Sequence, residues 1–450
     1  MNYLPIIKTF MHNNKYYMYD TYTNRILMVS KSLFVGLSNI EKFGISNPCS
    51  LSDKKSCDAI QALITKGMLK SDFISFIERD ETAYIADLVN NGVNDVSLQI
   101  TQNCNFKCRY CMFANESNID RRHQNVNMTW DVARRSIDFV YTHSIDCKFI
   151  NMAFYGGEPL LNFKTIKQVV DYCDKLFISK KIIYSMTTNL SILTDEMIDF
   201  FKDNGFRLSI SLDGGKDVQN KHRKFAQNGI GSFEVVYNNV EKLRKRQPDY
   251  FDKSVNFLPV ILTDEDHEDV LSFFESVNIK AEKIHFLEAD FSGNDYYYND
   301  YDSNKNSFFS RDEIMLTNIE KRMKESYLDK SLLPVKWHHG GMCIPGLRRL
   351  FIDVNGTFYP CEKIINRNFL SIGDLDKGFC YKKIDELMNI GKITEKECKK
   401  CWAMRFCEIC ALFCYDVEKN VISIEQKRRA CNFQKKRALS FIKKYVENIE

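Results

Sequence analysis

The sequence has little that would suit it to a membrane or to nucleic acid. No uninterrupted apolar run approaches the roughly 18–20 residues that a membrane-spanning helix needs. The first residues lack a basic stretch followed by a long apolar segment, so we expect no signal peptide and a cytoplasmic location. The formal net charge is only +4 over 450 residues, which indicates neither a nucleic-acid partner nor an anionic membrane surface.

Cysteine, by contrast, is abundant, with 16 in the chain. Disulfides are rare in the cytoplasm, so thiolate ligands to metal are the better explanation. Eleven of the 16 cysteines fall into motif-like positions. The remaining five are isolated and are expected to be buried apolar or incidental residues: Cys49, Cys57, Cys147, Cys173 and Cys380.

The most informative cysteines are Cys104, Cys108 and Cys111, which follow a strand-like run at 96–100. Three thiolates on one tight loop can hold three irons of a cubane cluster. The next cysteine is Cys147, so the fourth iron would stay open for another ligand. A structural zinc site or an incidental group of thiols is the alternative.

Strand-like and helix-like segments alternate strictly through residues 94–290. Strands are expected at 96–100, 149–155, 182–186, 207–212, 255–262 and 283–287. Amphipathic helices are expected between them at 129–143, 163–176, 194–204, 232–246 and 265–277. Such alternation predicts an α/β fold with a parallel sheet and crossover helices. Ligands of such sheets bind where the strands end.

The cysteine spacing, with Tyr110 just before the last cysteine, resembles the signature of the radical S-adenosylmethionine (SAM) superfamily. The alternating elements resemble the partial (β/α)6 barrel of that family. The resemblance covers roughly residues 95–435. It implies that the open iron chelates the amino and carboxylate groups of SAM. It also implies that an electron from the 4Fe-4S cluster cleaves SAM to a 5′-deoxyadenosyl radical.

Several strand ends carry residues that could bind SAM. Gly156, Gly157 and Glu158 resemble the GGE motif of the family, in which glycines let the backbone approach the methionyl group and a carboxylate accepts from its ammonium. A tight turn is the alternative. Residues at the next strand ends could bond the ribose or the methionyl carboxylate: Thr188, Asn189, Ser211 and Asp213. Arg223 matches an arginine of the peptide-maturing branch and could pair with the SAM carboxylate, or else be a solvated charge.

A second group of cysteines lies near the C-terminus: Cys343, Cys361, Cys398, Cys401, Cys407, Cys410, Cys414 and Cys431. Four of them, Cys398 to Cys410, could form a zinc site. Zinc would leave the other four without a role, whereas eight thiolates suit two further 4Fe-4S clusters.

The arrangement resembles the SPASM extension of radical SAM enzymes that modify peptides. The resemblance implies an outer auxiliary cluster at Cys398, Cys401, Cys407 and Cys431. It implies an inner cluster at Cys343, Cys361 and one or both of Cys410 and Cys414. The family usually has one cysteine at x3 after the Cys407 position, whereas this chain has two, at x2 and x6.

Glu362 follows Cys361 directly. In sulfatase-maturing relatives an aspartate at that place is a base, so the glutamate argues mildly against sulfatase maturation. A carboxylate beside the inner cluster could still take a proton from the substrate. A supporting or surface role is the alternative.

Residues 1–92 read as a separate front module. Strands at 15–20 and 25–30 form a hairpin, and helix-like segments follow near 32–43, 58–66 and 71–85. The stretch resembles the winged-helix-like modules with which peptide-processing radical SAM enzymes bind the leader of their precursor. The leader would add a strand to the hairpin edge. A dimerisation domain or a DNA-binding wing is the alternative.

The chain is thus expected to comprise four parts: the leader-binding module at 1–92, the barrel at 93–290, a connection at 291–336 and the SPASM domain at 337–450. Segments 128–133, 154–161 and 359–363 look most like maturases of cysteine-rich ribosomal peptides, the ranthipeptide or SCIFF type, which form sulfur-to-carbon thioethers. Carbon–carbon crosslinking and formylglycine formation in sulfatases are the alternatives within the family, and a non-catalytic metal-binding scaffold is the alternative outside it. The expected partners are a precursor peptide with its leader and an electron donor such as flavodoxin or ferredoxin.

Overall fold

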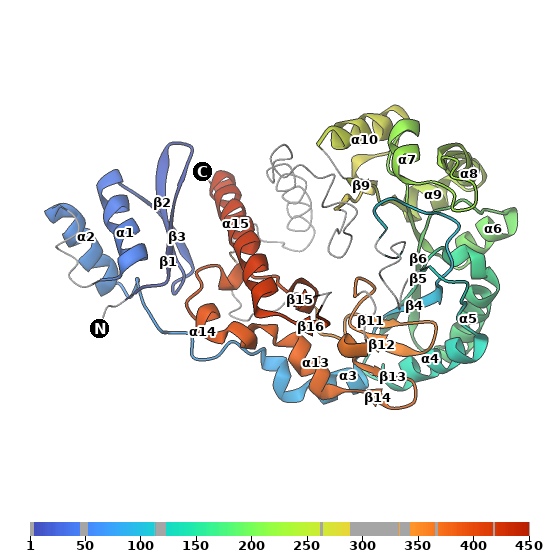
Figure 1. The fold of residues 1–450 in the computed structure, drawn as a ribbon, viewed down its shortest axis with the longest axis horizontal. Helices are drawn as coiled ribbons and strands as arrows, with labels where there is room; N and C mark the ends of the chain where they lie inside the picture. Colours follow the sequence, from blue (N-terminus) through green and yellow to red (C-terminus); the bar gives the residue numbers. More distant parts are fainter. Residues whose placement is uncertain are drawn as a thin grey trace.

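The largest sheet among the described residues has nine strands in the computed structural model, in which it lies on the right of Figure 1. The structure describes residues 4–45, 53–111, 113, 123–261, 264–288, 333, 343–364, 368–416 and 419–449. Strand order in the sheet is β14-β13-β12-β11-β4-β5-β6-β7-β8.

Five neighbouring strands are parallel and come from the region of strict alternation. They are β4 (Asp95–Thr101), β5 (Phe149–Gly156), β6 (Lys181–Thr188), β7 (Arg207–Ile210) and β8 (Val255–Phe257). The helices between them are α4 (Trp130–Thr142), α5 (Phe163–Leu176), α6 (Asp195–Asp203), α7 (Lys216–His222), α8 (Phe233–Arg246) and α9 (Pro248–Ser254). The α/β fold expected from the sequence is therefore confirmed.

The fifth and sixth predicted strands, at 255–262 and 283–287, form shorter pieces than expected. Residues 255–262 were predicted as one strand, but pairing with β7 ends at Phe257. β9 (Val260–Ile261) follows Pro259, which has no N–H to donate to a ladder. β10 (Leu287–Glu288) pairs in parallel with β9, and a parallel bridge joins Phe257 to Ile284. Helix α10 (Asp264–Ser276) makes this crossover.

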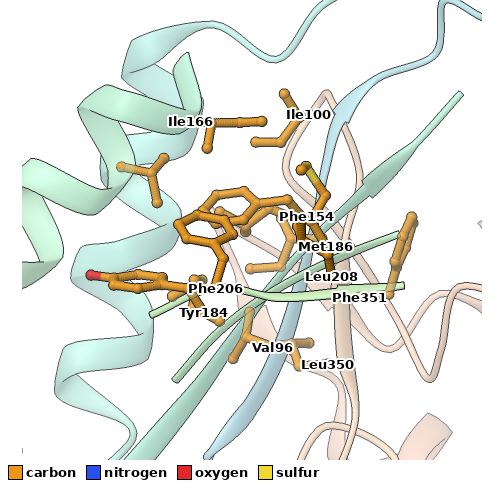
Figure 2. Packing of buried hydrophobic residues seen from close by; sticks show 14 of the residues in the cluster. Val96, Ile100, Phe154, Ile166, Tyr184, Met186, Phe206, Leu208, Leu350 and Phe351 are labelled. Carbon is orange, nitrogen blue, oxygen red and sulfur yellow. The ribbon is translucent and has the colours of Figure 1, made fainter. Parts of the chain in front are cut away.

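Aromatic rings stack across the parallel strands and form the centre of the core. The Phe206 ring lies 5.6 Å from that of Phe154 and 5.4 Å from that of Tyr184, with interplanar angles of 16° and 17°. Figure 2 shows these rings between the sheet and Ile166 of α5. Strand and helix apolar positions thus meet on one face, as their periodicities predicted.

The C-terminal residues extend the same sheet beyond β4. β11 (Leu350–Ile352) pairs in parallel with β4, and β12 (Thr357–Tyr359), β13 (Gly373–Asp374) and β14 (Gly378–Phe379) continue antiparallel. After them come α13 (Tyr381–Met388), η6 (Ile390–Thr394), α14 (Glu395–Cys398), η7 (Met404–Phe406), η8 (Ala411–Cys414), β15 (Tyr415–Asp416), β16 (Val421–Ile422) and α15 (Ile424–Ile449). The cysteine-rich extension is therefore joined to the barrel by main-chain pairing.

The front residues form a three-stranded antiparallel sheet with two helices. β1 (Ile7–His12), β2 (Lys15–Asp20) and β3 (Arg25–Val29) precede α1 (Lys31–Phe43) and α2 (Lys54–Thr65). The hairpin of β2 and β3 was predicted, whereas β1 was not. Asn13 and Asn14, with φ of 46° and 59°, make the tight turn between β1 and β2, a conformation that asparagine adopts more readily than most residues.

Both faces of this front sheet are covered. Ile7 and Met18 pack against α1 and α2. Tyr17 and Tyr19 pack on the other side, in a cluster with Ile442 of α15. Figure 1 shows α15, in red, beside the front strands. The front sheet consequently shares its core with the C-terminal extension.

The predicted helix at 71–85 is wrong. Residues 71–79 are not helical, and only η2 (Asp80–Tyr84) and α3 (Ile85–Asn91) follow. Ile74 and Ile77 have helical spacing, but they are buried against Met404 and Cys398 of the extension. Packing between distant segments thus produces the same spacing without a helix.

The connection expected at 291–336, apart from Leu333, lies outside the described residues. Among the helices that the structure describes, none combines the length and apolar composition needed to cross a membrane.

Candidate functional site

The candidate SAM-binding residues gather at the carboxyl edge of the parallel strands. The loop with Cys104, Cys108 and Cys111 follows β4, Gly156 ends β5 and Thr188 ends β6. β4, β5, β6 and β7 are neighbours in the sheet, so their carboxyl ends meet at one edge, where ligands of α/β sheets bind.

The two glycines allow the end of β5 to approach the cysteine loop. Gly156 has φ of 145°, and a Cβ there would lie 2.1 Å from the Thr101 carbonyl oxygen. A Cβ on Gly157 would lie 2.2 Å from the Asn103 carbonyl oxygen and 2.9 Å from Cys104 Cβ. Only glycine fits at either position. The close approach of the cysteine loop therefore requires glycine at both positions, whatever ligand binds beside the loop.

Glu158 is fully buried and joins the ends of β5 and β6. Its Oε1 accepts from Leu160 N–H at 3.1 Å and from Thr188 Oγ1–H at 2.6 Å, and its Oε2 accepts from Asn189 N–H at 2.6 Å. Burial raises the pKa of this carboxyl group to about 7. Both carboxylate oxygens of Glu158 therefore accept hydrogen bonds from groups of the protein itself.

The side chains of Thr188 and Asn189 are likewise used within the site. Thr188 Oγ1 accepts from the Leu190 N–H at 2.9 Å, and Asn189 Nδ2 donates to Asn105 Oδ1 at 2.9 Å. Ser211 is half-buried, and its N–H donates to the Thr188 carbonyl at 2.9 Å. These residues link neighbouring strand ends to each other and to the cysteine loop.

Asp213 and Arg223 form a buried ion pair behind the cysteine loop. Asp213 has no exposed surface, and Arg223 is 7% exposed. Arg223 Nε and Nη2 donate to the two Asp213 oxygens at 2.8 and 3.0 Å. The same carboxylate accepts from Tyr110 Oη–H and from the Val260 N–H. The interpretation of Arg223 as a solvated charge is therefore wrong.

The charge of this ion pair also acts on a thiol of the cysteine loop. Burial raises the pKa of Cys108 to about 12, and the positive charge of Arg223 opposes that rise. The guanidinium carbon also lies 5.2 Å from the centre of the Tyr110 ring. Tyr110, Asp213 and Arg223 thus connect the cysteine loop to the end of β7, where the sequence had suggested direct contacts with SAM.

The three thiols of the loop are close enough for their charges to interact. Burial raises the pKa of Cys104, and thiolates at Cys108 and Cys111 would raise it further. Cys111 Sγ lies 3.7 Å from His123 Nε2, and burial lowers the pKa of this histidine to about 4. His123 had no signal in the sequence, since a single histidine twelve residues away belongs to no motif.

The cysteines of the extension form two sets in the structure. Burial raises the pKa of Cys361 to about 12, and a thiolate at Cys410 would add to that rise. Burial likewise raises the pKa of Cys410, and a thiolate at Cys343 would add to it. Cys343, Cys361 and Cys410 are therefore neighbours, and we call them the inner set.

The outer set is Cys398, Cys401, Cys407 and Cys431. Burial raises the pKa of Cys407 to about 12, and thiolates at the other three positions would raise it further. Cys414 is fully buried, which raises the pKa of its thiol; the charge of Lys427 lowers that pKa, and thiolates at Cys410, Cys431 and Cys407 would raise it.

Cysteine thiolates are the usual ligands of iron–sulfur clusters, so both sets offer suitable donor atoms. In the part of the chain that the structure describes, no three His, Cys, Asp or Glu side chains are close enough to hold a single metal ion.

Two arginines near the inner set were not predicted from the sequence as part of the site. Arg349 Nη1 lies 3.3 Å from Glu362 Oε1, and its charge lowers the pKa of Cys343 against the effect of burial. Arg79, from the front part of the chain, donates to the Cys343 carbonyl at 3.3 Å. Glu362 is thus ion-paired beside the inner set.

Comparisons with known proteins agree with this geometry. A family model described as the Radical SAM superfamily matches residues 98–276. That segment, about two fifths of the chain, is therefore similar to radical SAM domains.

A cysteine-type anaerobic sulfatase-maturating enzyme of Clostridium novyi is 29% identical over 157 residues, 33% of this chain and 40% of that protein. The radical SAM cyclopropyl synthase TigE of Paramaledivibacter caminithermalis is 26% identical over 204 residues, 42% of this chain and 41% of that protein. The chain thus spans about two fifths of the length of these curated relatives.

A solved structure, native anSMEcpe with bound AdoMet, matches with a TM-score of 0.57 at 18% identity, covering 78% of this chain and 98% of that one. At this identity the similarity establishes a shared fold.

The Asp213 ion pair gives a testable prediction. Asp213→Asn leaves the buried Arg223 charge without its carboxylate and should lower the free energy of unfolding by about 3–5 kcal/mol. Tyr110→Phe removes one hydrogen bond and should cost about 1 kcal/mol. Asp217→Asn, at an exposed position of α7, is the control. Anaerobic urea unfolding measures all three, and equal stability of the Asp213 and Asp217 variants would contradict the assignment.

Proposed function

We propose that this chain is a radical SAM enzyme that modifies a ribosomally made, cysteine-rich peptide by joining peptide sulfur to peptide carbon. The observation that carries the proposal is the place of its thiols. Three follow the first strand of the segment that is similar to radical SAM domains. Two more sets lie in an extension that continues the same sheet.

The residues of the first site would bind and orient the cofactors. Cys104, Cys108 and Cys111 would hold a 4Fe-4S cluster with one iron open to SAM. Gly156 and Gly157 let the end of β5 approach the loop. The clusters would supply the two electron functions of this chemistry, reductive cleavage of SAM to a 5′-deoxyadenosyl radical and acceptance of an electron from the peptide.

The auxiliary sets give a reason for this choice of product. Forming a thioether removes two hydrogens from the peptide, and the 5′-deoxyadenosyl radical takes only one as a hydrogen atom. The second leaves as a proton and an electron, so an electron acceptor is needed. Glu362, beside the inner set, is the carboxylate that we propose takes the proton.

We assign Cys410 to the inner set together with Cys343 and Cys361, because their charges interact. Cys398, Cys401, Cys407 and Cys431 would hold the outer cluster. A flavodoxin or ferredoxin would supply the electron that reduces the first cluster.

Formylglycine formation is the second candidate, because relatives include a sulfatase-maturating enzyme. Carbon–carbon crosslinking is a third, because TigE is named a cyclopropyl synthase. Both reactions also remove hydrogen from a peptide or protein side chain. The position of Glu362 is compatible with all of them, so the product must be tested directly.

β3 lies at an edge of the three-stranded front sheet, where, among the described residues, no further strand pairs with it and a leader peptide could add one. The Thr9 N–H of β1 is directed away from β2 and donates to Glu41 Oε2 at 2.8 Å, so α1 covers the β1 edge. Antiparallel pairs alternate between bonded and non-bonded. Thr9 and Met18 are therefore a non-bonded pair, and Met18 instead forms a hydrogen-bonded pair with Leu27 of β3. The next residue of β3, Met28, then has its N–H directed away from β2. We propose that the leader pairs with β3.

The first prediction from this function concerns iron. The anaerobically purified chain should hold about twelve irons, in three 4Fe-4S clusters. Replacing Cys104, Cys108 and Cys111 by alanine should leave about eight irons and abolish 5′-deoxyadenosine formation. Cys410→Ala should lose about four irons, whereas Cys414→Ala should keep them. Stoichiometric zinc with little iron would instead indicate a non-catalytic metal-binding scaffold.

The second prediction concerns the leader. Met28→Pro removes an outward N–H and should weaken binding of the leader by about five- to tenfold. Met28→Ala keeps the N–H and should bind within about twofold of the unaltered chain. The probe is a labelled leader from the precursor encoded beside the gene. The full chain is required, because the front sheet shares its core with α15. Equal affinity of the two variants would exclude pairing at β3.

The third prediction concerns the product. A thioether removes one alkylatable cysteine from the peptide for every two hydrogens lost. Mass spectrometry before and after iodoacetamide treatment measures both quantities. A product that has lost hydrogen and still alkylates at every cysteine would exclude the thioether and favour carbon–carbon crosslinking or formylglycine.

A further inference from the structure

Lys427 is a fully buried lysine in the first turn of α15. Burying an ammonium group is costly unless hydrogen bonds and a negative charge compensate it. The burial of Lys427 therefore requires an account of what it contacts.

The ammonium group has three acceptors. Lys427 Nζ donates to the Gly391 carbonyl at 3.4 Å, to Thr394 Oγ1, and to Cys398 Sγ at 3.2 Å. Thr394 Oγ1 also lies 3.4 Å from Cys398 Sγ. Because the threonine oxygen accepts from the lysine, its own hydrogen can be donated to the sulfur. Two donors therefore meet at the Cys398 sulfur.

Two of the three acceptors are neutral oxygens, and the third is the Cys398 sulfur. The charge of Lys427 also acts on neighbouring cysteines. Burial raises the pKa of Cys414 and of Cys431, and Lys427 lowers both. An anionic thiolate set beside it is the compensation that a buried ammonium needs.

A second cation lies farther along the same helix. Burial raises the pKa of Cys401, and Lys435 lowers it. Lys435 is exposed, so solvent screens its charge. The nearby Glu397 is paired with Arg428 at 2.5 Å. Lys427 is thus the buried cation of this region that touches a sulfur.

We propose that Lys427 is a positioning residue for the outer set, which donates to Cys398 and makes a cluster held there easier to reduce. The inference rests on the proposed function, in which Cys398, Cys401, Cys407 and Cys431 hold a 4Fe-4S cluster. Hydrogen bonds to the sulfurs and nearby positive charge both favour the reduced form, which carries one more negative charge. The outer set is thereby suited to accept electrons.

Anaerobic redox titration followed by electron paramagnetic resonance tests this role. The full chain with Cys104, Cys108 and Cys111 replaced by alanine serves as the background, so that only the auxiliary sets contribute. Lys427→Met removes the charge and the donor. It should shift the reduction equilibrium of the outer set at least about tenfold toward the oxidised form, about 59 mV for a one-electron couple. The inner set should keep its potential.

Two further variants separate this role from a purely structural one. Thr394→Val removes the second donor without changing charge, and it should shift the outer potential in the same direction by a smaller amount. Lys436→Met removes a charge from an exposed position of the same helix and should leave the potential unchanged. Thr394→Val also keeps the inference testable if Lys427→Met fails to fold.

The outcomes distinguish the inference from the function on which it rests. Iron is counted first in the background protein. Little iron there would contradict the outer cluster and the inference together. Full iron with an unchanged outer potential in Lys427→Met, or an equal shift in Lys436→Met, would overturn the inference alone.

Discussion

The rest of the structure depends on one constraint, which is the burial of thiols that would have to become thiolates to hold the proposed clusters. Burial raises the pKa of cysteines in all three sets, among them Cys108, Cys361 and Cys407. Such thiols would stay protonated at neutral pH until a metal displaced the proton, so binding of the proposed clusters would be coupled to folding. The protein provides cations at each place. Arg223 acts on Cys108, Arg349 on the inner set and Lys427 on the outer set.

The same constraint explains why the parts of the chain share cores. The loop that carries the outer set is covered by the front of the chain, where Ile6 and Ile77 pack with Met404. Helix α15 contributes Cys431 and Lys427 near its start and packs against the front sheet near its end. A leader bound at β3 and a cluster in the outer set would therefore be supported by one helix. The parallel strands β4, β5 and β6 lie on the other side of the extension from the front strands (Figure 1).

Much of the fold could be predicted because its signals are local. Helix starts at Thr129 and Thr194 follow from side chains that accept from N–H groups three residues later. Alternation of strands and helices gave the parallel sheet, and the three-cysteine spacing gave the loop after β4. The helix expected at 71–85 failed because Ile74 and Ile77 are buried by contacts with the extension. β1 was not predicted, because its pairing with β2, rather than a pattern in its own residues, makes it a strand.

The sequence by itself determined which residue types stand within a few positions of each other, since local backbone geometry fixes those distances. Only the tertiary structure decided which distant groups meet. It placed Cys410 with Cys343 and Cys361, Asp213 against Tyr110 from a loop 103 residues earlier, and Lys427 on the sulfur of Cys398. Buried charges and thiols must find partners, and these come from whatever packing brings near rather than from sequence neighbours. No spacing rule encodes such contacts, because packing of the sheet, the extension and α15 creates them.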